Sequence, residues 1–173
     1  QFHLNNDKIK LVENPYGKPH IKGYRAIHYN ISHSGDWVVC AISQSVIGID
    51  IQKFEGMKFG IVEHCFSKDE RKYLFSLGKA QQLISFYDMW TLKEAYIKAI
   101  GKGLFQQLSE FSVLKDGKDF RLFTKEPLNK KFFFKKYSIE KGYSLSVCSQ
   151  ENNFCAKLEE LFIDDLIKRF NLY

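Results

Sequence analysis

The strongest constraint on the fold is one long helix, which the sequence predicts over residues 81–100. Leu92, Tyr96 and Ile100 recur at helical spacing, so they share one apolar face. Gly101 follows directly, at the position where a glycine commonly ends a helix. The whole chain has 173 residues, which is enough for one domain or for two small halves that share a core.

Short strands are expected on both sides of this helix. Three apolar runs precede it, and the short breaks between them favour antiparallel neighbours: residues 26–32, 37–43 and 46–51. Further strands follow it, with a hairpin turn at 140–142: residues 111–115, 119–123, 130–139 and 143–149. Shorter helices are expected near 61–66, after Ser67 (with Glu70 completing a capping box) and within 158–170, whereas the first 25 residues are expected to be irregular. Strands and helices do not alternate regularly, so the predicted fold class is α+β.

The composition limits the partners. Lys and Arg exceed Asp and Glu by 26 to 20, and this net charge of +6 favours an anionic partner. Only four of these cations are arginines, so nucleic acid is not favoured. The absence of a long apolar run and of a secretory signal predicts no membrane association and a cytoplasmic protein. Cys40, Cys65, Cys148 and Cys155 form no CxxC pair and are expected to be reduced, buried thiols.

Two carboxylates stand out as candidates for chemistry. In the predicted strand, Asp50 and Gln52 face the side opposite to three isoleucines, either as a solvated surface or as part of a metal or catalytic site. On the predicted helix, Glu94 and Lys98 are spaced i, i+4, with Lys93 at the edge of the same stripe. They form either a surface ion pair or a carboxylate for a divalent cation beside ammonium groups for phosphate.

His33 is a third candidate. It stands between two serines just before Gly35, either as a turn residue without a role or as a donor to a phosphate. No set of His and Cys residues has zinc-site spacing, and no glycine-rich run matches a P-loop or dinucleotide fingerprint.

Taken in order, five motifs resemble the 4′-phosphopantetheinyl transferases, in particular the monomeric type that activates surfactin and gramicidin synthetases. The motifs are GKP at 17–19, NISHSG at 30–35, GIDIQ at 48–52, FSKDE at 66–70 and WTLKEAYIKAIGKGL at 90–104. The resemblance implies a pseudo-symmetric pair of α+β halves that hold coenzyme A between them. Residues 1–47 would be the remainder of the N-terminal half, much of which is expected to be missing, and residues 48–173 would be the C-terminal half.

The resemblance also implies a reaction and its residues. A serine of an acidic apo acyl or peptidyl carrier protein attacks the β-phosphate of coenzyme A, giving holo-carrier and 3′,5′-ADP, and the enzyme is expected to be a monomer. Asp50, Gln52 and Glu94 would bind Mg²⁺, or Mn²⁺ in its place. The residues expected to bind coenzyme A are Lys18, Ser32, His33, Lys93 and Lys98. Glu70, Glu94 and Lys98 would be catalytic, with Glu70 as the general base and Lys98 assisting the leaving ADP.

The sequence departs from the family at Gln52, where a glutamate is usual, so one negative charge is lost. This keeps open an alternative function, a non-catalytic module that binds coenzyme A or a carrier protein. A second alternative is a nucleic-acid binder that uses the aromatic and basic segment 130–136. Phe132 and Phe134 are expected to point into the core instead.

Overall fold

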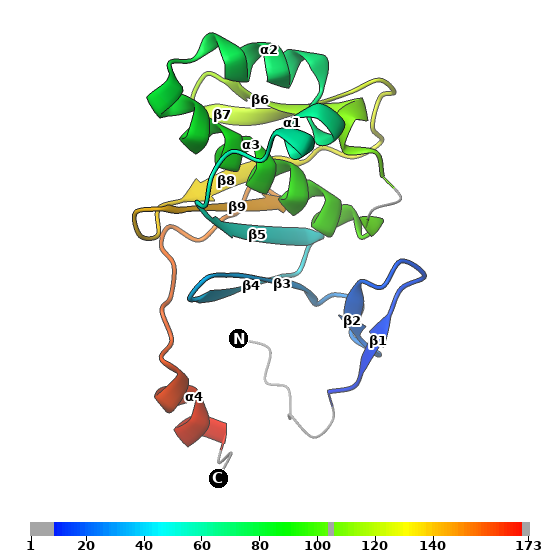
Figure 1. Cartoon of the computed structure of the whole chain (residues 1–173). Helices are drawn as coiled ribbons and strands as arrows, with labels where there is room; N and C mark the ends of the chain where they lie inside the picture. The colour runs from blue at the N-terminus through cyan, green and yellow to red at the C-terminus, as the bar shows by residue number, and fades with distance from the viewer. Residues whose placement is uncertain (1–8, 104–105, 171–173) are drawn as a thin grey trace.

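The computed structural model describes residues 9–103 and 106–170, so Leu104, the last residue of the long helix motif, lies outside the described residues. Helix α3 lies across a three-stranded sheet of order β5-β9-β8 (Figure 1). Hairpin β6–β7 and helices α1 and α2 lie above this helix in that view, and hairpin β3–β4 lies below the sheet. The mixed arrangement confirms the predicted α+β class.

Most of the predicted elements are present, with shifted ends. The strands are β1 (Leu11–Glu13), β2 (Pro19–Ile21), β3 (His28–Ser34), β4 (Trp37–Ser43), β5 (Ile47–Lys53), β6 (Phe111–Asp116), β7 (Asp119–Thr124), β8 (Phe133–Tyr137) and β9 (Tyr143–Ser149). The helices are α1 (Phe59–Cys65), α2 (Lys68–Ser76), α3 (Lys79–Ile100) and α4 (Ile163–Phe170), with a 3-10 turn at Leu108–Glu110. The small hairpin β1–β2 replaces part of the irregular segment expected at the start of the chain.

The ends of α2 and α3 follow the local sequence signals. The Ser67 side chain accepts a hydrogen bond from the backbone N–H of Glu70, whose carboxylate accepts one from the N–H of Ser67, which is the predicted capping box. At the end of α3, Gly101 adopts the left-handed conformation (φ 65°), and its N–H donates to the carbonyl of Ile97. A glycine adopts this conformation at low cost, so the helix ends here as predicted.

Strand β5 does not pair with β4, contrary to the expectation of three antiparallel neighbours. It pairs with β9, some hundred residues further along the chain. The other edge of β5 faces β3, where side chains take the place of backbone pairing. Asn30, Ser32 and Ser34 accept hydrogen bonds from the N–H groups of Ile49 (2.8 Å), Ile51 (3.3 Å) and Lys53 (2.9 Å). We call these three contacts the side-chain ladder.

Both faces of β5 are buried. The isoleucines at 47, 49 and 51 pack with Leu145 and Val147 of β9 and with residues of β4. The opposite face meets α3 so closely that a Cβ atom on Gly48 would lie 2.1 Å from the Ala95 carbonyl oxygen and 2.3 Å from the Ala99 nitrogen. Only glycine fits there, and this contact brings Asp50, two residues further on, against the helix.

Helix α3 is buried on more than the one predicted face. Residues Leu92 and Tyr96 pack with Phe111 and Phe134, whereas Phe86 packs with Phe66 and Leu74 on another side. Phe134 is buried and Phe132 packs against the first of these clusters, as predicted. These two rings are therefore not available to stack on bases, which removes the feature that suggested nucleic-acid binding.

The four cysteines are free, but only Cys148 is buried. Cys65 is partly buried, whereas Cys40 on β4 and Cys155 after β9 are exposed, so the expectation of buried thiols is wrong for these two. Cys40 is exposed because strand alternation turns it away from the sheet, onto the outer face of the hairpin. None of the described helices is long and apolar enough to span a membrane.

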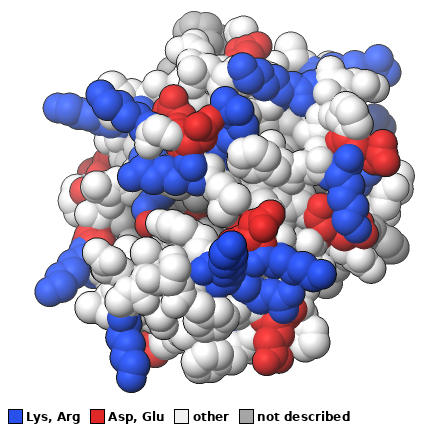
Figure 2. Space-filling model, turned by 90° about the horizontal axis from the view of Figure 1, so that it is seen from above, with Lys and Arg blue, Asp and Glu red and all other residues white. Residues whose placement is uncertain are grey.

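The net positive charge is spread over the surface. On the face above α2 and the β6–β7 hairpin, lysine and arginine side chains are scattered from the edge to the middle, and acidic side chains lie beside several of them (Figure 2). Two such exposed pairs are Arg121 with Asp116 (2.6 Å) and Lys125 with Glu110 (3.1 Å). Exposed pairs of this kind contribute little to stability.

Candidate active site

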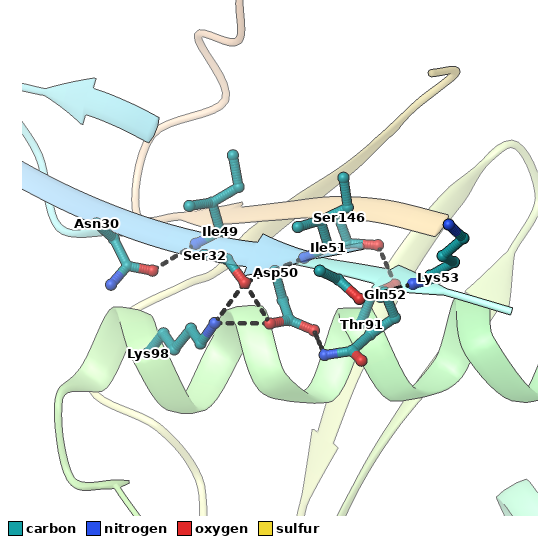
Figure 3. A network of polar contacts seen from close by, with 11 residues as sticks. Asn30, Ser32, Ile49, Asp50, Ile51, Gln52, Lys53, Thr91, Lys98 and Ser146 are labelled. Carbon is teal, nitrogen blue, oxygen red and sulfur yellow. Dashed lines mark hydrogen bonds and ion pairs between the residues drawn. The ribbon is translucent and has the colours of Figure 1, made fainter. Parts of the chain in front are cut away.

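Asp50 is the centre of a buried polar cluster between β3, β5 and α3 (Figure 3). Its Oδ1 accepts hydrogen bonds from the Lys98 ammonium at 2.6 Å and from the Ser32 hydroxyl at 2.9 Å. Lys98 also donates to the Ser32 oxygen at 2.8 Å, so the three side chains form a closed triangle. The structure thus brings together three residues that lie far apart in the sequence and that the motifs had singled out.

Burial dominates the electrostatics of Asp50. Its side chain is only 2% exposed, and this desolvation raises the pKa of the carboxyl, although the Lys98 ammonium acts in the opposite direction. Gln52 lies on the same face of β5 and donates from Nε2 to Asp50 Oδ2 at 3.2 Å. Its amide oxygen is left free to meet a cation or the water bound to one. The interpretation of this strand face as solvated surface is therefore wrong.

Glu94 faces the same region from α3. No hydrogen-bond donor or cation among the described residues contacts its carboxylate, and Lys98 pairs with Asp50 instead of Glu94. The surface ion pair that the i, i+4 spacing allowed is therefore not formed. Burial and the negative charge of Asp50 raise the pKa of Glu94 to about 7. Two neighbouring carboxylates, one of them without a partner, are suited to a divalent cation.

The described residues contain no group of three or more His, Cys, Asp or Glu side chains that could hold a metal ion. The donor set here is two carboxylates and one carboxamide. It still fits Mg²⁺, because this ion commonly takes one or two protein carboxylates and completes its octahedron with water and substrate phosphate.

A pocket of about 310 Å³ opens beside Glu94 and Lys98. One wall is formed by Gly17 and Lys18, in the loop between β1 and β2, and by Pro19 at the start of β2. Asn30 of β3 lines the pocket as well. Residues of three sequence motifs, GKP, NISHSG and the long helix motif, therefore meet at one pocket. Asn30 was not among the predicted site residues, although it begins the NISHSG motif.

Lys18 connects this wall of the pocket to β5 and α3. Its ammonium donates to the carbonyls of Ile47 and Ala99, both at 3.0 Å, and burial lowers the pKa of Lys18 to about 8. Asn14, which the sequence analysis also missed, accepts from the N–H groups of Tyr16 and Lys18 and donates to the carbonyl of Gly101. An asparagine just before a Pro-Tyr-Gly turn is the local signal that could have identified it.

Glu70 and Lys93 lie outside this cluster. They form an ion pair of 2.7 Å in which both side chains are fully buried. Glu70 also accepts from the backbone N–H groups of Ser67 and Val113, and Lys93 donates to the carbonyl of Phe111. Both side chains are buried in this arrangement, whereas the roles predicted for Glu70 as general base and for Lys93 as phosphate ligand require contact with a substrate, so these roles stay predictions. The pair connects α2, α3 and β6.

His33 is also separated from the cluster. Strand alternation places Ser32 toward Asp50 and His33 on the opposite, exposed face of β3. Any contact between His33 and a ligand would therefore be made on the outer side of the hairpin.

Comparisons with known proteins bear on this arrangement. A sequence model of the 4′-phosphopantetheinyl transferase superfamily matches residues 46–148, which include Asp50, Glu94 and Lys98. The chain belongs to this superfamily. One relative is the 4′-phosphopantetheinyl transferase ffp of Bacillus subtilis, which is 39% identical over 89% of this chain and 69% of the relative. Another is the 4′-phosphopantetheinyl transferase Sfp of B. subtilis strain 168, which is 34% identical over 96% of this chain and 75% of the relative.

Solved structures of the superfamily share the fold. Holo-(acyl-carrier-protein) synthase of Bacillus anthracis, in complex with coenzyme A, superposes with a TM-score of 0.53 at 22% identity over 61% of this chain and 94% of that chain. The Thermotoga maritima holo-[acyl-carrier-protein] synthase superposes with a TM-score of 0.52 at 16% identity, over 61% of this chain and 62% of that chain. The predicted phosphopantetheinyl transferase fold is thus confirmed for the part that this chain contains.

Proposed function

We propose that this protein transfers the 4′-phosphopantetheine group of coenzyme A to a serine of an apo acyl or peptidyl carrier protein. The observation that carries the proposal is a pocket lined by Glu94 and Lys98, with Asp50 paired to Lys98 at 2.6 Å. Residues 17–19 form one wall of this pocket. The names of its relatives, which are 4′-phosphopantetheinyl transferases, support the same reaction.

The transfer breaks the bond between the β-phosphorus and the oxygen that links it to 3′,5′-ADP, and it forms a bond from the serine oxygen to the same phosphorus. The Lys98 side chain lines the pocket, and its ammonium is positioned by a hydrogen bond of 2.6 Å from Nζ to Asp50 Oδ1. Its Nζ can donate to a phosphate oxygen as negative charge develops there. Glu94, whose carboxylate has no hydrogen-bond donor or cation in contact among the described residues, can accept the serine proton directly or through a water.

Asp50, Glu94 and Gln52 would hold Mg²⁺, with Mn²⁺ as a substitute. When bound, the ion neutralises the diphosphate charge and orients the phosphate groups. A carboxamide at position 52 contributes an oxygen without a charge, so this site should bind the ion less tightly than one built from three carboxylates. We further propose that the enzyme acts as a monomer in the cytoplasm, where coenzyme A and an acidic carrier would meet it.

A product assay tests the function. Apo carrier, coenzyme A and Mg²⁺ are incubated with the protein, and the mass of the carrier and the release of 3′,5′-ADP are measured, with EDTA as the metal control. Asp50→Asn should reduce the rate at least about a hundredfold, because it removes the charge that positions Lys98. Asp116→Asn is the matched control, since it also breaks an Asp–cation pair of 2.6 Å, but at the surface.

The possible outcomes separate the alternatives. Coenzyme A binding without any transfer to a panel of apo carriers would favour the non-catalytic module. A rate that Asp50→Asn leaves unchanged would remove this cluster from the reaction.

A further inference from the structure

Asn30 has a hydrogen-bonding capacity that the fold does not use. The residue is only 9% exposed, and its Oδ1 accepts a hydrogen bond of 2.8 Å from the backbone N–H of Ile49. Because that backbone group can only donate, it fixes which end of the Asn30 amide faces β5. The Nδ2 group, with two donors, must therefore face the other way.

The Nδ2 group faces the pocket. Figure 3 shows the nitrogen of Asn30 directed away from Ile49, toward the side of the strand on which α3 and Lys98 lie. Asn30 lines the pocket together with Glu94 and Lys98. No acceptor among the described residues takes a hydrogen bond from Nδ2. Among the described residues, only the Tyr29 hydroxyl is fully buried without a partner, so Nδ2 is accessible to water or to a ligand in the pocket.

We propose that Asn30 binds the diphosphate of coenzyme A, with Nδ2 donating to a phosphate oxygen. This assignment rests on the proposed function and names a further binding residue for it. A phosphate oxygen is the favoured acceptor because the Lys98 ammonium lines the same pocket, so an anionic group is drawn there. Asn30 adds a neutral donor, and the backbone N–H of Ile49 in β5 fixes the direction of that donor. Asn30 should therefore recognise the position of a phosphate oxygen more than its charge.

The alternative is that Asn30 serves the side-chain ladder alone. The ladder itself supplies the variant that separates the two roles. Ser32 and Ser34 show that a serine in β3 can accept a hydrogen bond from a β5 N–H group. Asn30→Ser should therefore keep the contact with Ile49 while removing the Nδ2 donors, without adding a charge to the pocket. Ser34→Ala is the matched control, because it removes a contact of the ladder at its exposed end.

The experiment measures the dissociation constant of coenzyme A by calorimetry in Mg²⁺ buffer, and the competition constant of inorganic pyrophosphate against it. Pyrophosphate carries both phosphates without the nucleotide or the pantetheine. We expect Asn30→Ser to weaken both ligands about tenfold, with a melting temperature close to that of wild type. Ser34→Ala should leave both constants within about twofold of wild type.

Other results overturn the assignment. If only coenzyme A binds more weakly and the constant for pyrophosphate is unchanged, the donor does not meet the diphosphate. If neither constant changes in a wild-type protein that binds coenzyme A, Asn30 belongs to the ladder alone. If wild type binds neither ligand, the proposed function fails, and this assignment fails with it.

Discussion

Glu94 should make the metal-free protein less stable as the pH rises, and Glu94→Gln should remove this dependence. The pKa of this carboxyl rises from an ordinary 4.5 to about 7 on folding, because the side chain is desolvated and lies near Asp50. Between these two pH values the folded state binds more protons than the unfolded state. The free energy of unfolding therefore falls as the pH rises through this window.

The size of the effect follows from the shift. A change from 4.5 to about 7 corresponds to about 3 kcal/mol, at 1.36 kcal/mol per pKa unit. Stability associated with Glu94 is complete below pH 4.5 and is lost by about pH 8. Glu94→Gln should thus stabilise the protein by about 3 kcal/mol at pH 8, or about 6–12 °C in melting temperature for a chain of this size. At pH 4.5 it should have little effect.

Urea unfolding in EDTA at pH 5 and pH 8 measures this difference. Glu63→Gln, on the exposed side of α1, is the control, because it removes a carboxylate at the surface. Mg²⁺ at pH 8 should recover part of the stability in wild type but not in Glu94→Gln, since an ion held by Glu94 favours the charged form. A stability difference between wild type and Glu94→Gln that is the same at pH 5 and pH 8 would refute the reasoning.

Three further predictions concern other contacts. Glu70→Gln should cost about 3–5 kcal/mol of unfolding free energy, because it leaves the Lys93 ammonium buried without its partner; a lost turnover at saturating coenzyme A with unchanged urea unfolding would instead support Glu70 as a base. Gly48→Ala should destabilise the protein by about 3 kcal/mol, because the added Cβ overlaps the α3 backbone. The control Gly60→Ala, whose Cβ meets nothing within 4 Å, should be neutral or stabilising. Equal melting temperatures of the two variants in thermal denaturation would contradict the predicted overlap. Gln52→Glu should lower the Mg²⁺ concentration for half-maximal transfer about tenfold, and titration curves that overlay would place residue 52 outside the metal shell.

The sequence predicted the elements that local signals determine. The capping box at Ser67, the glycine that ends α3, and the hairpin β8–β9 all depend on residues close together in the chain. The family motifs also singled out Asp50, Glu94 and Lys98, which the fold brings to one place. The residue types alone left a solvated surface or a surface ion pair open for these side chains, and the order of the motifs selected them.

The contacts that the sequence did not predict are those made over a distance or by side chains alone. The pairing of β5 with β9 depends on a partner far along the chain, and the ladder from β3 replaces backbone pairing, which leaves no periodic pattern. Lys93 and Glu94 are adjacent on a helix that is buried on several sides, so spacing could not tell which of them faces the pocket. In the structure, Lys93 pairs with Glu70, whereas Glu94 lines the pocket.

Because of the contact at Gly48, the distance between β5 and α3 at the active site is determined by the main-chain atoms of these two elements. Strand β5 rests on the main chain of α3 at Ala95 and Ala99, without an intervening side chain whose rotamer could adjust. The separation between the residue pair Asp50 and Lys98 should therefore tolerate hydrophobic replacements elsewhere in the core, which alter side-chain packing only. Conversely, an engineer who wished to admit a larger ion or a different phosphate donor would begin at position 48, where one added methyl group moves strand and helix apart.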